Sequence, residues 1–274
     1  MRHRIGTAMA AMLAIAVIAT GCSSSKNNSS GSPSAPPPGA TATGAGAPQT
    51  ASGTIIVFAA ASLQEAFTTL GKQFEDANPG TKVTLNFGAS SALAEQINSG
   101  APADVFASAS PTNMQQVVDA GGASGPTNFV RNVMEIAVPP SNPANVASVA
   151  DLAKSGVKVA LCQPQVPCGA VAAKVFANAG VTVTAVTLEP DVKSTLSKVE
   201  MNEVDAGVVY VTDVRSAGDK VKGIVIPDDI NASTEYPIAA LTKAANPTGA
   251  QAFVAFVLSP AGQAVLAAGG FEQP

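Results

Sequence analysis

Short apolar runs alternate with segments of helical periodicity from residue 54 almost to the end of the chain. The first run, residues 54–58, is continuously apolar, as expected of a buried parallel strand. Beyond it, apolar residues recur at the spacing of one helix face, at Leu63, Ala66, Phe67, Leu70 and Phe74. Ser62 and Glu65 form the S-x-x-E pattern of a capping box, which predicts that Ser62 is the N-cap of this helix.

The same alternation continues through the chain. It predicts strands over residues 82–87, 105–107, 133–138, 157–161, 207–211 and 237–241. It predicts helices around residues 93–97 and over residues 112–120, 169–178, 191–202, 248–258 and 260–267. Strands that alternate with helices imply parallel or mixed sheets with helices on both faces, so the predicted fold class is α/β.

The length of this part of the chain favours two lobes of ordinary size with a ligand cleft between them. The pair Pro139-Pro140 follows a predicted strand and indicates a crossing between the lobes. We expect residues 53–136 together with residues 237–274 to form lobe 1, and residues 137–236 to form lobe 2.

The first residues have the composition of an export signal. A basic start is followed by an apolar stretch over residues 8–19, too short to span a bilayer comfortably, and by small residues that end at Cys22. The stretch resembles a lipobox, although Ala19 stands where lipoproteins usually carry Leu. We expect residues 1–21 to be a lipoprotein signal peptide and Cys22 to carry acyl chains such as palmitate; the alternative is an ordinary secreted protein. Residues 22–52, rich in Ser, Pro, Gly and Ala, are predicted to be a disordered linker.

Composition excludes several classes of function. The chain is 46% hydrophobic and 12% charged with a net charge of −4, which argues against a nucleic-acid binder. Its one histidine is His3, inside the predicted signal, so a Ser-His-Asp triad, a Cys-His pair and a histidine metal site are excluded from the mature protein. The absence of tryptophan weakens a sugar-binding interpretation.

The acidic residues do not form a recognisable catalytic pair. Asp104, Asp205 and the pair Asp228-Asp229 are candidates for acid–base chemistry, but turn and cap roles account for Asp205 and for Asp228-Asp229. We therefore expect a binding protein and not an enzyme. Cys162 and Cys168 are predicted to form a disulfide that tightens one loop; a redox motif would favour C-x-x-C spacing.

Four junctions between a predicted strand and the following helix are small, polar or Gly-rich: residues 59–62, 88–91, 166–169 and 190–192. In α/β folds, ligands bind at the carboxyl ends of strands, where helices begin. Helix N-termini offer unpaired N–H groups and a partial positive charge, so several of them in one cleft would make an anion site.

The junctions also carry a family resemblance. The segments V-F-A-A-A-S-L at 57–63, F-G-A-S-S-A-L at 87–93 and G-A-P-A-D-V-F at 100–106 resemble the periplasmic molybdate-binding proteins of ABC importers. The match continues in order through V-P-C-G at 166–169, D-V at 191–192 and G-V-V-Y at 207–210, and covers residues 54–271. The resemblance implies a two-lobed, periplasmic-binding-protein-like fold of type II that closes over a tetrahedral oxyanion.

The resemblance also implies a ligand set. Ser62 and Ser90 would each offer a hydroxyl and a backbone N–H group, Cys168 and Val192 a backbone N–H group, and Tyr210 its phenol. From the residues alone, Val192 and Tyr210 would be a core residue and a half-buried strand aromatic. The set contains no Lys, Arg or carboxylate, so it suits a fully deprotonated oxyanion and disfavours phosphate, which keeps a proton.

The function implied is capture of molybdate, and of tungstate with it, for delivery to the permease of an ABC importer. The metal would be bound as its oxyanion, without direct metal ligands from the protein and without a cofactor. We expect a monomer anchored by lipid to the extracytoplasmic face of the cell membrane. The alternatives are a receptor for another oxyanion such as sulfate or phosphonate, an extracellular enzyme of related fold, or an adhesive surface protein.

Overall fold

The computed structural model describes residues 51–274. The predicted signal peptide, the lipid on Cys22 and the predicted linker up to residue 50 lie outside the described residues. Within residues 51–274 no single helix is long and apolar enough to cross a membrane; the helices Pro247–Leu258 and Pro260–Gly269 pass that test only as a pair, across a bend of 62°.

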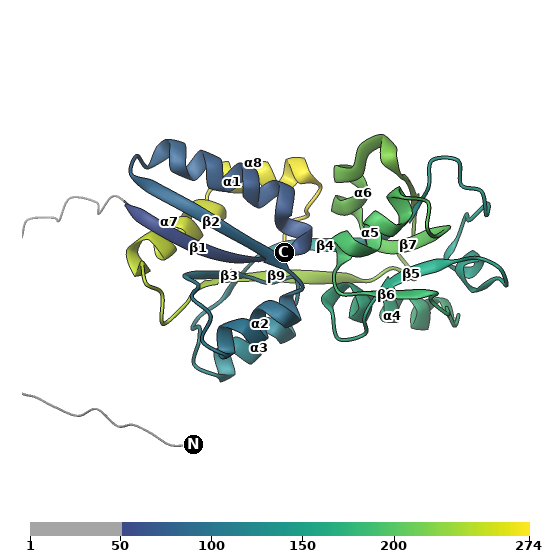
Figure 1. The fold of residues 1–274 in the computed structure, drawn as a ribbon, viewed down its shortest axis with the longest axis horizontal. Helices are drawn as coiled ribbons and strands as arrows, with labels where there is room; N and C mark the ends of the chain where they lie inside the picture. Colours follow the sequence, from purple (N-terminus) through teal and green to yellow (C-terminus); the bar gives the residue numbers. More distant parts are fainter. Residues whose placement is uncertain (1–50) are drawn as a thin grey trace, which may run out of the picture. The chain divides into compact units, whose positions relative to one another are not determined.

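Lobe 1 is built on a mixed sheet with the strand order β2-β1-β3-β9-β4 (Figure 1). The first three strands are parallel, and β9 runs antiparallel to β3 and β4. The elements are β1 (Gly53–Ala60), α1 (Gln64–Ala77), β2 (Thr81–Gly88), α2 (Ser90–Asn98), β3 (Val105–Ala107), α3 (Pro111–Asp119), β4 (Thr127–Val138), β9 (Ser233–Ala240), α7 (Pro247–Leu258) and α8 (Pro260–Gly269). Two separate clusters of buried side chains lie in this lobe, one around Phe67 and Phe253 and one around Phe106. The sheet is therefore packed on both faces.

Lobe 2 continues the sheet from the second half of β4, in the order β4-β7-β5-β6, with β8 on the other side of β4. Its elements are β5 (Val159–Cys162), α4 (Pro167–Ala179), β6 (Thr187–Glu189), α5 (Val192–Glu200), β7 (Ala206–Tyr210), α6 (Val211–Ala217) and β8 (Lys222–Val225). Short 3-10 turns at Val149–Ala153 and Gly218–Lys220 complete it. One core of aliphatic side chains holds these elements together, and it includes Ala61 and Ala89 from lobe 1. The lobes are therefore in contact across the cleft.

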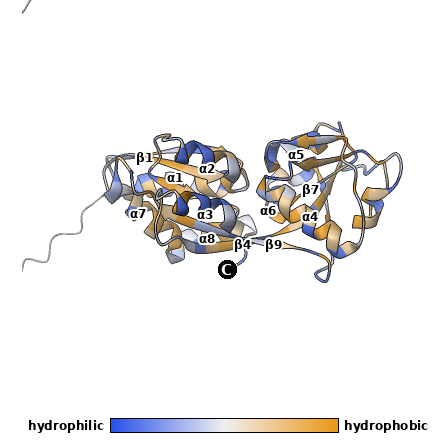
Figure 2. Cartoon of the chain, turned by 90° about the horizontal axis from the view of Figure 1, so that it is seen from below, coloured by the Kyte–Doolittle hydropathy of each residue, from blue (hydrophilic) through white to orange (hydrophobic). Residues whose placement is uncertain are grey.

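Two strands carry the chain between the lobes, and they run side by side in both views (Figures 1 and 2). β4 pairs with β9 up to Val133 and with β7 and β8 from Met134 onward. This crossing between the lobes lies inside β4, before the Pro139-Pro140 pair that the sequence favoured. β4 is one continuous strand that pairs with different strands in its two halves. The residue bounds predicted for the two lobes stay a prediction.

The predicted α/β class with two lobes is confirmed, and apolar residues colour the strands inside both lobes in Figure 2. The local prediction for Ser62 is wrong. Ser62 lies in a 3-10 turn, Ala61–Leu63, and Leu63 is the N-cap of α1 without a side-chain bond. The capping box does not form, since the Ser62 hydroxyl bonds elsewhere and Glu65 faces lobe 2.

The sequence also missed β6, α6 and β8, which are short, and it placed the start of β9 too late. Pro237 suggested the first residue of a strand. In the structure, the pairing of β4 with β9 is irregular between Asn128 and Val130, opposite Pro237 and Tyr236. An irregularity of this kind accommodates a residue without an N–H group inside a strand.

Candidate functional site

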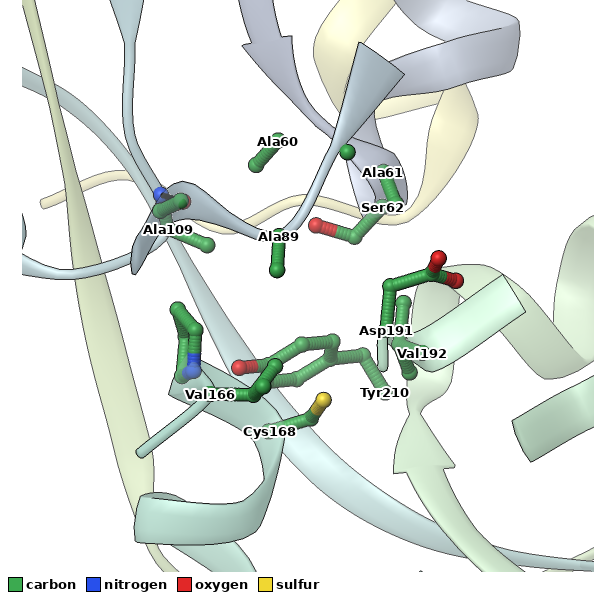
Figure 3. A pocket seen from close by; sticks show the side chains of 13 residues that line it. Ala60, Ala61, Ser62, Ala89, Ala109, Val166, Cys168, Asp191, Val192 and Tyr210 are labelled. Carbon is green, nitrogen blue, oxygen red and sulfur yellow. Dashed lines mark hydrogen bonds between the residues drawn. The ribbon is translucent and has the colours of Figure 1, made fainter. Parts of the chain in front are cut away.

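A small cavity lies between the lobes at the carboxyl ends of six strands (Figure 3). Lobe 1 contributes the residues that follow β1, β2 and β3, and lobe 2 contributes those that follow β5, β6 and β7. The lining residues are Ala60, Ala61, Ser62, Gly88, Ala89, Ser90, Ala109, Val166, Pro167, Cys168, Asp191, Val192 and Tyr210. All five residues predicted to bind a ligand are in this set, although they come from five separate segments.

The cavity is small enough to select by size. Its volume is about 10 Å³ as the space open to the centre of a water molecule. Adding the ~1.4 Å radius of water gives a rounded hollow of about 2.7 Å radius. A space of this size suits one compact anion of a few atoms.

On the lobe 1 side, two serine hydroxyls are held by buried partners. Ser90 Oγ accepts a hydrogen bond from the backbone N–H of Ala109 at 2.9 Å. Ser62 Oγ lies 2.8 Å from the hydroxyl of Tyr236, a residue of β9. Both serines are at most 4% exposed. Because the Ser90 oxygen already accepts a bond, its own proton is available to an acceptor in the cavity.

On the lobe 2 side, the first turn of α4 is locked to the loop before it. Cys162 ends β5, Cys168 lies in the first turn of α4, and a disulfide joins them with their Cα atoms 5.8 Å apart. Pro167 occupies the start of the helix, where an N–H group is not needed. A Cβ atom on Gly169 would lie 2.1 Å from the carbonyl oxygen of Gln163, so only glycine allows this close approach. The unpaired N–H groups at the start of α4 are therefore held rigidly against the cavity.

The other two groups from lobe 2 come from α5 and β7. Asp191 caps α5 by accepting the N–H of Ser194 at 2.8 Å, which leaves Val192 in the first turn with its backbone N–H unpaired within the helix. Tyr210 is 1% exposed, and its hydroxyl has no hydrogen-bond partner among the described residues. A buried hydroxyl without a partner costs about 1–3 kcal/mol, so this hydroxyl is available to bond a ligand in the cavity.

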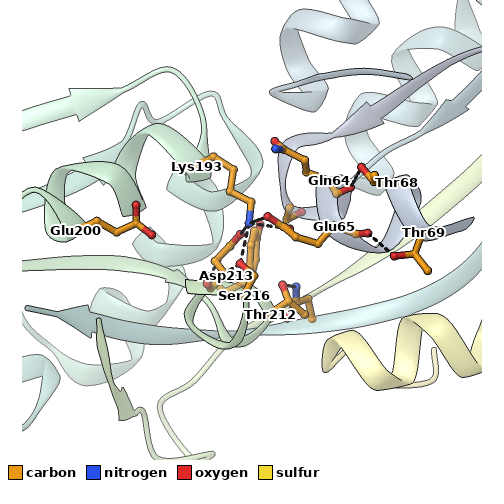
Figure 4. A network of polar contacts seen from close by, with 12 residues as sticks. Gln64, Glu65, Thr68, Thr69, Lys193, Glu200, Thr212, Asp213 and Ser216 are labelled. Atoms are coloured by element: carbon orange, nitrogen blue, oxygen red, sulfur yellow. Dashed lines mark hydrogen bonds and ion pairs between the residues drawn. The ribbon is translucent and has the colours of Figure 1, made fainter. Parts of the chain in front are cut away.

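An ion pair joins the lobes next to these residues (Figure 4). Lys193 of α5 donates to both carboxylate oxygens of Glu65 on α1 at 2.9 Å, and its Nζ lies 3.2 Å from Asp213 Oδ1 on α6. Burial raises the pKa of Asp213 to about 6, although Lys193 and the N–H of Tyr210 act in the opposite direction. Burial alone would lower the pKa of Lys193, but Asp213 and Glu65 raise it above its ordinary value.

The acidic residues considered for catalysis have structural roles. Asp104 accepts the backbone N–H groups of Ile56 and Asn246 with its two oxygens. Asp205 accepts the N–H of Lys158 at 2.8 Å. Neither residue lines the cavity. Asp228-Asp229 form a turn, and within residues 51–274 no group of His, Cys, Asp and Glu side chains could hold a metal ion.

The lining side chains offer hydroxyl donors but no cation and no free carboxylate. None of the lining side chains is Lys or Arg, and the one carboxylate, Asp191, is engaged as a helix cap. Oriented neutral dipoles in a cleft closed to water can hold a bare anion, whereas a protonated one would require an acceptor. The arrangement thus matches an acceptor-only ligand.

The sequence analysis did not single out four residues near the cavity that do not line it. Tyr236 contacts Ser62, Asn132 contacts Tyr236, and Lys193 pairs with Glu65. A compositional signal existed for Tyr236, since the chain has only two tyrosines. For Glu65 the sequence suggested a local role in a capping box, and its partner in lobe 2 is 128 residues away. Contacts of this range have no periodic signature in a single sequence.

Comparison with known proteins identifies relatives over the same residues. Residues 55–272 match the family of bacterial extracellular solute-binding proteins. The molybdate-binding protein ModA of Mycobacterium tuberculosis is 42% identical, covering 83% of this chain and 87% of the relative. A putative ABC transporter substrate-binding lipoprotein of Bacillus subtilis, YvgL, is 35% identical over 68% of this chain and 72% of its own.

A solved structure shares the fold at lower identity. The sulfate-binding protein SubI from Mycobacterium tuberculosis superposes with a TM-score of 0.71 at 18% identity, covering 80% of this chain and 86% of that one. The fold alone therefore does not determine which oxyanion is bound. The family consists of binding proteins, in agreement with the expectation of binding without catalysis. The chain belongs to the bacterial extracellular solute-binding proteins, in the family that includes the molybdate-binding proteins ModA.

Proposed function

We propose that this protein captures molybdate, and tungstate with it, and delivers the ion to the permease of an ABC importer. The observation that carries the proposal is the cavity of about 10 Å³ between the lobes, whose lining has no cationic side chain and where the Tyr210 hydroxyl has no partner among residues 51–274. Ser62, Ser90, Cys168, Val192 and Tyr210 would form the ligand shell. The 42% identity to a ModA protein supports molybdate as the ion.

The donor set explains why protonated anions would be rejected. The proposed donors are two serine hydroxyls, the Tyr210 phenol and the backbone N–H groups at the starts of α2, α4, α5 and the 3-10 turn Ala61–Leu63, all of which belong to segments that line the cavity. Four anion oxygens without protons can accept all of these bonds. A hydrogen phosphate ion would direct its own O–H group at a donor, which costs a hydrogen bond and leaves a buried group unpaired.

Calorimetric titration of the purified protein with sodium molybdate tests the proposal. We expect a 1:1 complex and much weaker binding of phosphate. A protein that gives no binding with molybdate, or that binds phosphate equally well, would contradict the proposal. Competition with tungstate on the same sample should show displacement at similar concentrations.

The second candidate ligand is sulfate, which is also fully deprotonated and has the same tetrahedral shape. SubI, a sulfate-binding protein, shares the fold, and this observation keeps the candidate open. The two ions differ in size, so the titration should be repeated with sulfate. Tighter binding of sulfate than of molybdate would establish this alternative.

The lipid anchor on Cys22 and the monomeric state are further parts of the proposal. The lipobox-like sequence before Cys22 supports the anchor, and YvgL is a relative whose name describes a lipoprotein. Mass spectrometry of the N-terminal peptide from membrane fractions tests it, since an unmodified Cys22 or an uncleaved signal would contradict it. Sedimentation of the purified protein tests the monomer.

A further inference from the structure

The buried face of the cavity behind Ser62 contains a chain of polar side chains that the ligand set does not include. Asn132 Nδ2 lies 2.8 Å from Thr212 Oγ1 and 3.4 Å from the Tyr236 hydroxyl. The Tyr236 hydroxyl lies 2.8 Å from Ser62 Oγ. Tyr236 is fully buried, and the other three are at most 5% exposed, so water does not compete for these bonds.

The direction of each hydrogen bond among these side chains follows from one backbone group, the N–H of Val133. The N–H of Val133 can only donate, and it points at Asn132 Oδ1 at 3.1 Å. The other amide atom of Asn132 is therefore nitrogen, which donates to Thr212 and to Tyr236. Two oxygens near Tyr236 could take its proton, Ser62 Oγ and the Tyr210 hydroxyl, because Asn132 Nδ2 cannot accept. Ser62 Oγ lies at 2.8 Å, whereas the Tyr210 hydroxyl is not within hydrogen-bond geometry of any described residue, so the Tyr236 proton goes to Ser62 Oγ. The Ser62 proton cannot then point at Tyr236.

We infer that Tyr236 is a positioning residue for anion binding: it occupies the acceptor side of the Ser62 hydroxyl and turns the Ser62 proton into the cavity. The inference rests on the proposed function, because it gives a role within the same ligand shell. The consequence is a preference for anion oxygens that carry no proton. A Ser62 hydroxyl held as a donor can bond an anion oxygen but cannot accept the proton of a protonated one.

The hydroxyl group of Tyr236 can be removed without removing its packing. The ring contacts Phe129, Tyr210 and Phe271 edge-on at centroid distances of 5.5–6.4 Å, and phenylalanine would keep these contacts. Tyr236→Phe leaves the Ser62 hydroxyl free to rotate and to accept. We expect its affinity for molybdate to fall about 3–10-fold, the scale of one hydrogen bond.

A double-mutant cycle separates positioning from a general loosening of the protein. Calorimetry with molybdate is carried out on the wild type, Ser62→Ala, Tyr236→Phe and the double variant. If Tyr236 acts through Ser62, Tyr236→Phe should change the affinity less than about 1.5-fold once Ser62 is alanine. An equal loss in both backgrounds, or no loss beside an intact Ser62, would overturn the inference.

Two further variants keep the test decisive. Asn132→Leu removes the amide that donates to Tyr236 and preserves the size of the side chain. The loss of affinity should be smaller than in Tyr236→Phe and should also disappear in the Ser62→Ala background. Asn132→Leu replaces Tyr236→Phe if that variant does not fold. Thr242→Val is the control. It removes a hydrogen bond from the Thr242 hydroxyl to the Gly121 carbonyl in lobe 1, neither residue lines the cavity, and the affinity should be unchanged.

The wild-type titration is read before any variant and bears on the proposed function alone. If the wild type binds sulfate in place of molybdate, molybdate fails as the ligand, and the same cycle is measured with sulfate. Only the coupling between Tyr236 and Ser62 then decides the role of Tyr236.

Discussion

The two lobes supply hydrogen-bond donors to the cavity in different ways. Besides backbone N–H groups, lobe 1 uses two serine side chains whose oxygens are already engaged, Ser90 with the N–H of Ala109 and Ser62 with Tyr236. Lobe 2 uses backbone at helix starts and the Tyr210 hydroxyl, which has no partner among the described residues. Removing a group from lobe 1 therefore disturbs the protein without ligand, whereas removing the Tyr210 hydroxyl should disturb only the complex.

The largest effect is expected where lobe 2 depends on backbone geometry. Gly169→Ala would place a Cβ atom 2.1 Å from the Gln163 carbonyl and 2.8 Å from that of Cys162, in a loop closed by a disulfide. We expect at least about 2–3 kcal/mol of lost stability and more than about 30-fold weaker anion binding. Urea unfolding and calorimetry measure both.

A matched glycine in lobe 1 provides the control. Gly71 in α1 has room for a Cβ atom, whose nearest contacts would be 3.5 Å away on Val83 and Leu85. Gly71→Ala should leave binding unchanged and should not destabilise the helix. Wild-type affinity in Gly169→Ala would show that the start of α4 does not contribute to the site.

The buried carboxylate of lobe 2 should make stability depend on pH. The pKa of Asp213 is about 6 in the folded protein, against an ordinary value of 3.8. Between these values the folded state binds more protons than the unfolded state, so this group lowers the free energy of unfolding as the pH rises. The difference amounts to about 2–3 kcal/mol in total.

Asp213→Asn isolates this contribution. The amide oxygen can still accept the Tyr210 N–H, and Glu65 still faces Lys193. Relative to the wild type, the variant should gain stability as the pH rises from about 4 to about 7 in urea unfolding. A difference between the two proteins that does not change with pH would contradict the assignment.

The contrast between the two sides can be tested with a pair of single-atom deletions. Ser90→Ala leaves the buried N–H of Ala109 without a partner, so we expect a loss of about 1–2 kcal/mol of stability as well as weaker binding. Tyr210→Phe removes a hydroxyl that is already unpartnered, so binding should weaken about 10-fold while the stability of the ligand-free protein is unchanged or higher.

The readout is the melting temperature without and with molybdate. The two variants should differ without ligand and both lose part of the ligand-induced rise. A Tyr210→Phe variant that melts well below the wild type without ligand would show that this hydroxyl has a structural partner.

The smallest effect is expected at the ion pair between the lobes. Glu65→Gln weakens the contact with Lys193, whose side chain is 19% exposed beside a half-exposed Glu65. Such a pair contributes less than about 1 kcal/mol, so the affinity should fall about 2–4-fold at low salt and less at high salt.

Glu203→Gln is the matched control, because Glu203 pairs with Lys198 within lobe 2. It should leave the affinity unchanged at every salt concentration. An equal effect of both substitutions would indicate a general electrostatic influence and not a contact between the lobes.

Much of the fold could be predicted because its signals are local. The apolar run of β1 and the helical spacing from Leu63 to Phe74 both correspond to elements close to their predicted positions. Errors occurred where tertiary contacts outweigh local preference: Ser62 has a good capping pattern but bonds to Tyr236 instead. Pro237 likewise lies inside β9, because the pairing with β4 is irregular at that point.

For the site, the sequence indicated candidate residues and the structure determined how they are arranged. Small and polar junctions after strands, the spacing of Cys162 and Cys168, and the family resemblance are all visible in the linear chain, and the five predicted ligand residues do line one cavity. The cavity's size, the unpartnered Tyr210 hydroxyl and the orientation of the Ser62 proton depend on packing. Tyr236 reaches Ser62 across 174 residues, and Lys193 reaches Glu65 across 128. A hydrogen bond is decided within about 3 Å, and only the folded chain brings such residues to that distance.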